Sequence, residues 1–438
     1  MPVFLILLLL SFAHNYIAAM LIENAKGKQT RKALLAVNVA MNLAPLLFFK
    51  YYGFIADNMN ALASFSGVPW LGLPPFAVQL PIGISFYTFQ VMSYVIDVYR
   101  RETPAQRSAV KLLMYEIMFC QLVAGPIIRY KDIARDIENR DLSVERFSKG
   151  VSRFIAGLGK KVFFADICGS LSDQFLGRDP GVLSVAGAWI GIALFALQIY
   201  FDFSGYTDMA IGMGHMFGFT YKENFNYPYM SKSATEFWRR WHMSLGSFFR
   251  DYLYIPLGGN RRFYLRNLAI VWFLTGLWHG ASWNFVLWGV YYAVLIAIEK
   301  VALARFLGAL PKAVGGAIGH AYLLFATLIG WAVFYYNDLG ALAAFVGTLF
   351  GRNGVGAFDV DIRPFMLDNA AFIAFAAIAA TPFFKEARVR LRSAIQRVRT
   401  LDALYFYVFT PLFNIGVLLL ATILLAGDTH NPFLYFQF

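Results

Sequence analysis

Long apolar runs recur along this sequence, and they restrict its fold more than any other feature. Runs such as 34–54, 183–203 and 405–426 are each long enough to cross a bilayer, because about 20 apolar residues in a helix span the hydrocarbon core. The chain of 438 residues has a mean hydropathy of +0.55 and only 15% charged residues. A soluble enzyme is therefore excluded. We predict an all-α, polytopic membrane protein, whose length would allow roughly ten to fourteen crossings.

Several apolar runs, such as 268–278, are too short for a full crossing. Inside a bilayer a short or Gly-interrupted segment survives only where protein or an aqueous cavity satisfies its backbone polar groups. We therefore expect re-entrant elements and an internal cavity that functional residues face. The first run, 1–21, has no basic leading region and no clear cleavage site, so we predict a retained membrane helix rather than a signal peptide.

The charges of the loops predict an orientation. Basic residues concentrate in segments 24–33, 99–111 and 385–399, and the positive-inside rule places these segments in the cytoplasm. Segments 56–80 and 427–438 contain neither Lys nor Arg and are predicted to face outward.

Segment 220–266 is the least membrane-like part of the centre of the chain. It combines many Lys and Arg residues with Trp and Tyr, which favour the membrane interface. We predict a cytoplasmic-side cap here, within a single domain covering 1–438, because no long linker separates a second domain. Membrane topology also explains the formal net charge of +12, so no nucleic-acid partner is implied.

The two cysteines and six histidines form no metal-binding pattern. No HExxH pair occurs, and no Cys or carboxylate cluster has the spacing of metal ligands. We expect no bound metal, no disulfide framework and no resident cofactor.

His279 lies at a Gly-punctuated break between two apolar runs. An ionisable group at membrane depth normally faces a cavity, and imidazole suits proton transfer near neutral pH. The alternative, which composition alone favours, is a histidine packed at a helix kink with both ring nitrogens hydrogen-bonded.

His242 lies in an aromatic and basic segment of the predicted cap. If this segment is helical, Trp238 and His242 share a face and could line a pocket, while Glu236 and Arg240 form an ion pair at the same spacing. The alternative is an interfacial helix anchored by Trp and Arg, and the two interpretations are compatible. Arg239 and Arg240 could also bind phosphate, although topology explains them without a ligand.

Asp202 and Ser204 close the apolar run at 183–203. The serine is not in a G-x-S-x-G elbow, so a hydrolase triad is disfavoured. Structural hydrogen bonding to the cap is the main interpretation of these side chains.

Six blocks of this sequence, in the same order, resemble the bacterial membrane-bound O-acyltransferases, and within them the branch that acts in alginate O-acetylation. The blocks are LPIGISFYTFQ (80–90), 122–127, 200–212, EFWRRWHMSL (236–245), 251–261 and GLWHGA (276–281), with a weaker likeness over 433–438. They define a family core over 80–281 that is far more specific than any single motif. The resemblance implies a ring-like bundle of membrane helices with a thinned centre and a central tunnel.

The same resemblance implies roles for individual residues. The position of His279 is the family's catalytic residue, and His242 occupies its second signature polar site, where His or Asn occurs. The substrate or tunnel candidates are Trp238, Arg239, Arg240, Trp278, Asn284, Asp202 and Ser204, of which Trp238 and Asn284 are also candidate oxyanion donors. The chain departs from the family at Cys120 and Gln121, where many relatives carry Pro followed by His or Gln. It is also expected to lack the first one or two hydrophobic segments of alginate-type members.

The implied function is O-acetyl transfer across the cell inner membrane. A cytoplasmic donor, most simply acetyl-CoA, delivers the acetyl group, and His279 acts as general base. The acceptor is a polysaccharide hydroxyl, as in alginate, another exopolysaccharide or peptidoglycan, or a periplasmic SGNH-type partner that relays the group. The alternatives are a non-catalytic polysaccharide transporter, which would predict internal repeats that we do not detect, and a structural subunit of an export complex.

Overall fold

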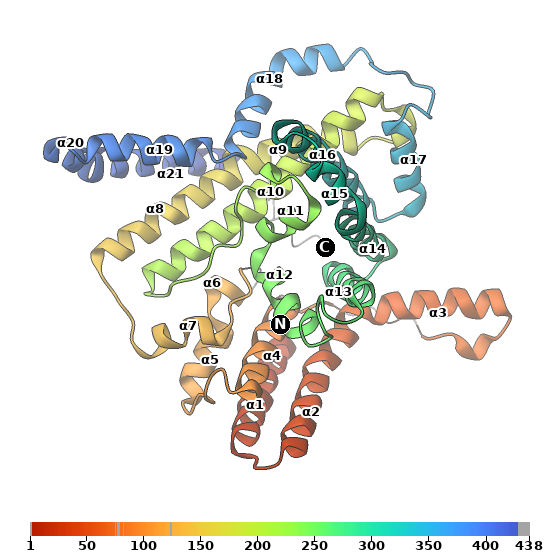
Figure 1. Ribbon diagram of the computed structural model, residues 1–438, viewed down its shortest axis with the longest axis vertical. Coiled ribbons are helices and arrows are strands. Elements are labelled where there is room, and N and C mark those ends of the chain that lie inside the picture. Colours follow the sequence, from red (N-terminus) through yellow and green to blue (C-terminus); the bar gives the residue numbers. More distant parts are fainter. Residues whose placement is uncertain (1, 75, 77–78, 82, 123–124, 428–438) are drawn as a thin grey trace. The chain divides into compact units, whose positions relative to one another are not determined.

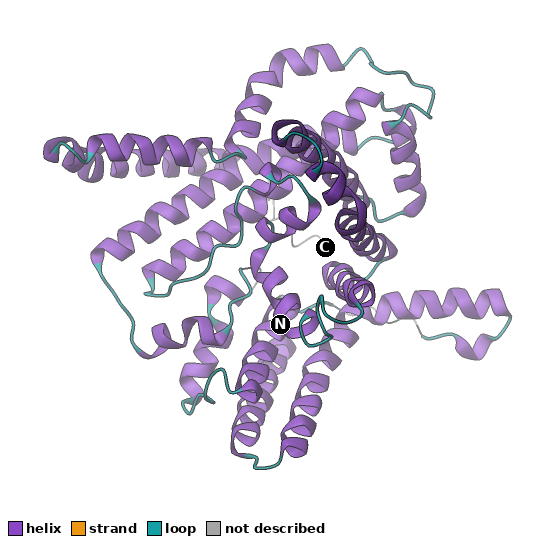
Figure 2. Ribbon diagram, in the orientation of Figure 1, coloured by secondary structure: helices purple, strands orange, loops and turns teal. Residues whose placement is uncertain are grey.

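The computed structural model describes residues 2–74, 76, 79–81, 83–122 and 125–427, which form helices joined by loops (Figures 1 and 2). Within these ranges there is no β-strand, and the predicted all-α class is confirmed. The likeness at 433–438 and nearly all of the tail predicted to face outward, 427–438, lie outside the described residues. Parts of the blocks at 80–90 and 122–127 also lie outside them.

Seven helical stretches of the described chain are long and apolar enough to cross a membrane. They are Phe4–Asn24, Lys28–Ser66, Val185–Met216, Trp283–Gly308, Lys312–Tyr335, Ile362–Ala379 and Arg399–Gly427. This finding confirms a polytopic membrane protein. The number is below the roughly ten to fourteen crossings that chain length allows, because several apolar runs form shorter helices. Examples are α4 (Ile84–Arg100), with 17 residues, and α13 (Tyr264–His279), with 16.

The chain divides into two compact units. The first comprises Met1–Phe147, Gly214–Lys222 and Ser244–Ser282. Besides α4 and α13 it holds α1 (Pro2–Asn24), α2 (Lys28–Leu46), α3 (Tyr52–Ser66), α5 (Ala109–Ile117), α6 (Phe119–Leu122), α7 (Tyr130–Glu138) and most of α12 (Met243–Phe249). Helices α1, α2 and α4 pack against one another to form its bundle.

Three buried asparagines join α1 to α2 inside this bundle. The Asn15 amide donates to Oδ1 of Asn42 at 3.0 Å, and the Asn38 amide donates to Oδ1 of Asn15 at 2.9 Å. In apolar surroundings such interhelical hydrogen bonds hold helices together where lipid offers no competing partner.

The second unit comprises Ser148–Met213, Glu223–Met243 and Trp283–Phe438. Its helices are most of α8 (Val144–Lys160), α9 (Ile167–Leu176), most of α10 (Val185–Met216), α11 (Ala234–Arg240), α14 (Trp283–Ile298), α15 (Ala304–Gly308), α16 (Lys312–Tyr335), α17 (Leu339–Leu349), α18 (Ile362–Ala379), α19 (Phe383–Ile395), α20 (Arg399–Leu404) and α21 (Thr410–Gly427). Helices α14 and α16 pack together. Helices α8 and α10 approach closely through glycines: a Cβ added to Gly157 would lie 2.5 Å from the Gly205 carbonyl oxygen.

Candidate functional site

His279 is the last residue of α13, in the first unit. The next residue, Gly280, is extended, with φ −162° and ψ 156°. Only 8% of His279 is exposed, and its ring centroid lies 5.0 Å from that of Trp278. The break that the sequence predicts between two apolar runs is therefore a helix end, and it carries a buried histidine.

Trp278 connects this helix end to α4. Its indole packs against Phe86 and Phe89, with ring centroids 5.3 and 5.9 Å apart. The indole Nε1 also donates to the Ser85 carbonyl oxygen at 3.4 Å. The block at 276–281 thus packs on the block at 80–90, although nearly 200 residues of chain separate them.

Lys50 and Tyr51 also reach the end of α13, and neither is among the residues predicted from the sequence. The Tyr51 hydroxyl donates to the Leu277 carbonyl oxygen at 2.6 Å. The Lys50 ammonium donates to the His279 carbonyl oxygen at 3.2 Å and to that of Trp278. A helix leaves its last carbonyl groups without intrahelical partners, and a cation there also opposes the negative end of the helix dipole.

A distinctive signal for Lys50 was present in the sequence. It lies inside the apolar run 34–54, where a charged residue is costly unless it has a partner or a function. Its placement depends on local backbone geometry: Pro45 is followed by a π-helical turn over Leu47–Tyr51, which joins α2 to α3. A π-turn often occurs at a functional site.

His242 lies in the second unit, between α11 and α12. It is 1% exposed and its backbone is left-handed, with φ 45°. Its Nδ1 lies 3.3 Å from Oδ1 of Asn224, and its ring meets Phe203 edge to face at 4.7 Å. Burial lowers the pKa of His242 to about 3, so the imidazole is neutral at physiological pH.

A continuous helix through the block at 236–245 is not what the structure shows. Helix α11 ends at Arg240, so Trp238 and His242 do not share the face of one helix. The backbone leaves the helix because it pairs with a neighbouring segment: Asn226 N–H donates to the Arg240 carbonyl oxygen, and Met243 N–H donates to that of Asn224.

The ion pair predicted for this block is confirmed. Glu236 and Arg240 form the expected ion pair, at 2.7 Å. Trp238 packs edge to face on Trp288 and Tyr292 of α14, and Arg239 is exposed.

Asp202, Ser204 and Asn284 are buried in the second unit. The Asp202 carboxylate lies 2.9 Å from the Lys161 ammonium, which also pairs with Asp166 at 2.7 Å. The Asn284 amide donates to the Val333 and Phe334 carbonyl oxygens at 3.4 and 3.3 Å, which ties α14 to α16. These contacts tie Asp202 to Lys161 and Asn284 to α16.

The candidates therefore fall into two groups. The first unit holds His279 and Trp278, and the second holds His242 with the remaining candidates. In the part of the chain that the structure describes, no group of three or more His, Cys, Asp or Glu residues could hold a metal ion.

Residues 80–336 match the family described as MBOAT, membrane-bound O-acyltransferase. The probable alginate O-acetylase AlgI of Pseudomonas putida is 37% identical over 435 residues, which cover 94% of this chain and 86% of that protein. The protein of the same name from Azotobacter vinelandii is 42% identical over 324 residues, covering 72% of this chain and 62% of its own length. The peptidoglycan O-acetyltransferase of Helicobacter pylori is 32% identical over 387 residues, which cover 80% of this chain and 71% of that protein.

Proposed function

This chain belongs to the membrane-bound O-acyltransferase family, and from that premise we propose that it transfers an acetyl group from cytoplasmic acetyl-CoA to a polysaccharide hydroxyl, or to a periplasmic SGNH-type protein that relays the group. Membership confirms the resemblance that the six blocks carry, and it confirms the predicted enzyme class. The proposed location is the cell inner membrane, with the chain crossing it several times.

The names of the relatives support this choice of reaction. The Pseudomonas and Azotobacter proteins are named for O-acetylation of alginate, and the Helicobacter protein is named for O-acetylation of peptidoglycan. Both polymers present sugar hydroxyl groups. We therefore assign an acetyl group as the cargo and a sugar hydroxyl as its final acceptor.

The observation that carries the mechanism is the buried imidazole of His279 at the end of α13. In the proposed reaction its basic nitrogen removes the proton of the acceptor hydroxyl, and that oxygen attacks the thioester carbonyl. The tetrahedral oxyanion then collapses, the carbon–sulfur bond breaks, and the imidazolium returns the proton to the thiolate of coenzyme A.

His242 is proposed to assist as a neutral group. Its low pKa, caused by burial, keeps it uncharged, and the Asn224 contact restrains its ring. A neutral imidazole can orient a substrate through a hydrogen bond without adding a charge to the site.

The test is the ester content of the polymer in cells that produce a His279→Ala variant. General-base catalysis is worth about 10²- to 10⁴-fold in rate, so acetylation is expected to fall by that factor while the amount of protein in the membrane is unchanged. His14→Ala is the matched control, because His14 is a histidine of another apolar helix, the candidate span Phe4–Asn24, and its ring bonds within that helix, to the Leu10 carbonyl oxygen at 3.0 Å. Wild-type ester content in His279→Ala would overturn the base assignment.

A deletion strain separates the transferase from a polysaccharide transporter. The transferase predicts a normal polymer yield with the esters lost. A loss of exported polymer, with normal ester content in whatever polymer remains, would favour the transporter instead.

A further inference from the structure

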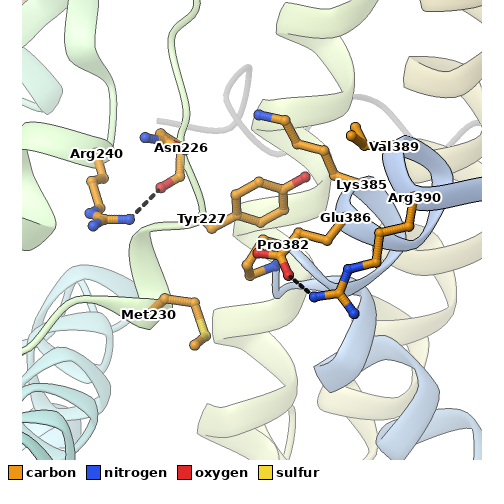
Figure 3. Close-up of a pocket in the computed structure, with 9 residues that line it drawn as sticks. All are labelled: Asn226, Tyr227, Met230, Arg240, Pro382, Lys385, Glu386, Val389 and Arg390. Atoms are coloured by element: carbon orange, nitrogen blue, oxygen red, sulfur yellow. Dashed lines mark hydrogen bonds and ion pairs between the residues drawn. The ribbon is translucent and has the colours of Figure 1, made fainter. Parts of the chain in front are cut away.

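A cavity of about 350 Å³ lies in the second unit, between the segment that precedes α11 and helix α19 (Figure 3). It is lined by Asn226, Tyr227, Met230, Arg240, Pro382, Lys385, Glu386, Val389 and Arg390. Its volume is in the range of small-molecule sites.

The charged groups of this cavity favour an anion. Three of its four charged side chains are basic, Arg240, Lys385 and Arg390, and only Glu386 is acidic. Arg240 is already paired with Glu236 at 2.7 Å, so Lys385 and Arg390 are the main cations available to an anion. The Glu386 carboxylate lies 3.9 Å from the Arg390 guanidinium. At this separation the carboxylate offsets only part of the positive charge of Arg390. Guanidinium and ammonium groups are the usual protein partners of phosphate, through charge-assisted hydrogen bonds.

Tyr227 gives the cavity a second feature of a binding site. It is a bulky residue in the left-handed region, with φ 48°, and such strain is typical of functional positions. Its ring lies within the cavity wall, and the Lys385 ammonium is 5.9 Å from the ring centroid. The ring thus supplies an aromatic surface beside the cations.

Both walls of the cavity come from segments that the sequence predicts to be cytoplasmic. Arg240 and Tyr227 belong to the predicted cap, 220–266, and Lys385 and Arg390 belong to the basic run 385–399. The fold of the second unit brings these two distant segments together. A ligand from the cytoplasm would therefore meet the cavity directly.

The cavity is also connected to His242 by a short stretch of paired backbone. Asn226 N–H donates to the Arg240 carbonyl oxygen at 2.9 Å, and Met243 N–H donates to the Asn224 carbonyl oxygen at 2.9 Å. Asn226 and Arg240 line the cavity, whereas Asn224 and His242 lie at the other end of the pairing. Two residues of extended chain span roughly 7 Å.

We propose that this cavity binds the phosphate groups of the cytoplasmic acyl donor, an assignment that rests on the proposed function. With acetyl-CoA, the phosphorylated nucleotide contacts Lys385 and Arg390 and the base lies against Tyr227. The flexible pantetheine arm then leads from the cavity toward His242. The same phosphate chemistry occurs in anionic lipid headgroups, so the experiment includes an arm for each source.

The kinetic test uses the purified full chain in phosphatidylcholine vesicles with a soluble acceptor. In a Lys385→Gln/Arg390→Gln variant, the KM for acetyl-CoA is expected to rise roughly five- to twentyfold, as two exposed ion pairs would give, with kcat within about twofold of wild type. The KM for S-acetylpantetheine, a donor without phosphate, is expected to be unchanged. A rise of equal size for both donors would overturn the proposal.

The matched control is Arg397→Gln/Arg399→Gln. These residues belong to the same basic run but do not line the cavity, and the variant changes the net charge by the same amount. The KM for acetyl-CoA should stay near the wild-type value. Equal effects of the two double variants would indicate general charge attraction and would overturn the assignment to this cavity.

Equilibrium binding of radiolabelled coenzyme A separates this proposal from the proposed function, because it needs no turnover. Weaker binding to Lys385→Gln/Arg390→Gln than to the control variant supports the cavity even if no acetyl transfer is observed. If the Lys385→Gln/Arg390→Gln variant transfers acetyl groups normally and binds coenzyme A as tightly as the control variant, the proposed function stands and the cavity is not the donor site. Adding phosphatidylglycerol to the vesicles is expected to leave coenzyme A binding unchanged. If phosphatidylglycerol instead weakens coenzyme A binding to the wild type but not to the Lys385→Gln/Arg390→Gln variant, the cavity binds the lipid headgroup and the proposal is overturned.

Discussion

At the residue scale, the C-terminal end of α13 is capped by side chains of a distant segment, and not by residues that follow it in the sequence. A helix commonly ends with a left-handed glycine that satisfies its last carbonyl groups. Gly280 is extended, and its N–H makes only a long bond of 3.4 Å to the Gly276 carbonyl oxygen. Lys50 and Tyr51 supply donors to this helix end instead. This arrangement fixes the backbone from which the His279 side chain projects.

We predict that Lys50→Met lowers both stability and activity. The variant removes a charged donor from two carbonyl groups, which should reduce the free energy of unfolding by about 1–3 kcal/mol. It should also lower kcat more than it raises KM, because the backbone of His279 is less well fixed. Thermal unfolding in detergent and the rate of acetyl transfer measure the two effects.

Two further variants make this prediction specific. Lys50→Arg keeps the cation and should recover part of the lost kcat. Tyr51→Phe removes one neutral hydrogen bond and should cost about 0.5–1.5 kcal/mol. A Lys50→Met protein with wild-type kcat would show that the contact is structural only.

His242 predicts a pH dependence of stability. Its pKa is about 3 when folded, against 6.5 for an ordinary histidine, so the unfolded chain binds the extra proton between these values. The contribution of neutral His242 to the free energy of unfolding is therefore fully present above pH 6.5. It falls as the pH drops toward 3, by up to about 1.4 kcal/mol per pH unit. His242→Asn removes this titration, so its melting temperature should fall less than that of wild type between pH 6.5 and 4.5. Parallel curves for the two proteins would contradict the prediction.

At the element scale, the approach of α8 and α10 depends on glycine. A Cβ at Gly157 would lie 2.5 Å from the Gly205 carbonyl oxygen and 2.7 Å from the Met209 nitrogen. Both are backbone atoms, so no change of side-chain rotamer can relieve the clash. The helices can therefore approach only because these positions carry no side chain.

Gly157→Ala is expected to destabilise the protein, because the helices must move apart or strain. The cost should be about 1–3 kcal/mol, as for an overpacked core. Gly416→Ala is the control: Gly416 lies in α21, in the same unit, and an added Cβ there meets nothing within 4 Å. That change should be neutral or stabilising, since alanine favours the helix by about 1 kcal/mol. Equal melting temperatures for the two variants would contradict the packing argument.

The ends of a helix were predictable from the sequence where hydropathy alone determines them. They were less predictable where contacts with distant residues determine them. The run 405–426 corresponds to the closing membrane stretch Arg399–Gly427. The run 183–203 ends too early, because α10 continues to Met216. It continues through a polar stretch whose Asp208 is paired with Lys160 at 2.7 Å and with Arg153 at 2.9 Å.

The candidate site shows the same division. The histidine at a break between apolar runs was visible in the sequence, since a Gly-punctuated end and a buried ionisable group are local features. The end of α11 at Arg240 was not visible, because it depends on pairing with the segment at 224–226. The role of Lys50 depends equally on a partner more than 200 residues away.

At the scale of the whole molecule, the loop charges and the helix lengths together predict how the first part of the chain passes through the membrane. The candidate span Lys28–Ser66 has 39 residues, about twice what a crossing requires. It bends where the π-helical turn joins α2 to α3, and Figure 1 shows α3 running in a different direction from α2. We therefore predict that α2 crosses outward from the basic segment 24–33. Although α4 has only 17 residues and is not among the seven long apolar stretches, we predict that it crosses back, because the segment 99–111 that follows it is also basic.

Labelling of single added cysteines tests this path. Ser66→Cys places a thiol at the exposed end of α3, and Arg397→Cys places one in the basic run after α19. The native Cys120 and Cys168 can stay, because both are buried and burial raises the pKa of each thiol to about 12. A maleimide that cannot cross the inner membrane should label Ser66→Cys in intact cells, but Arg397→Cys only after the membrane is opened. Labelling of Arg397→Cys in intact cells would place the basic run, and with it the cavity proposed for the donor, on the outer face, where acetyl-CoA is not supplied.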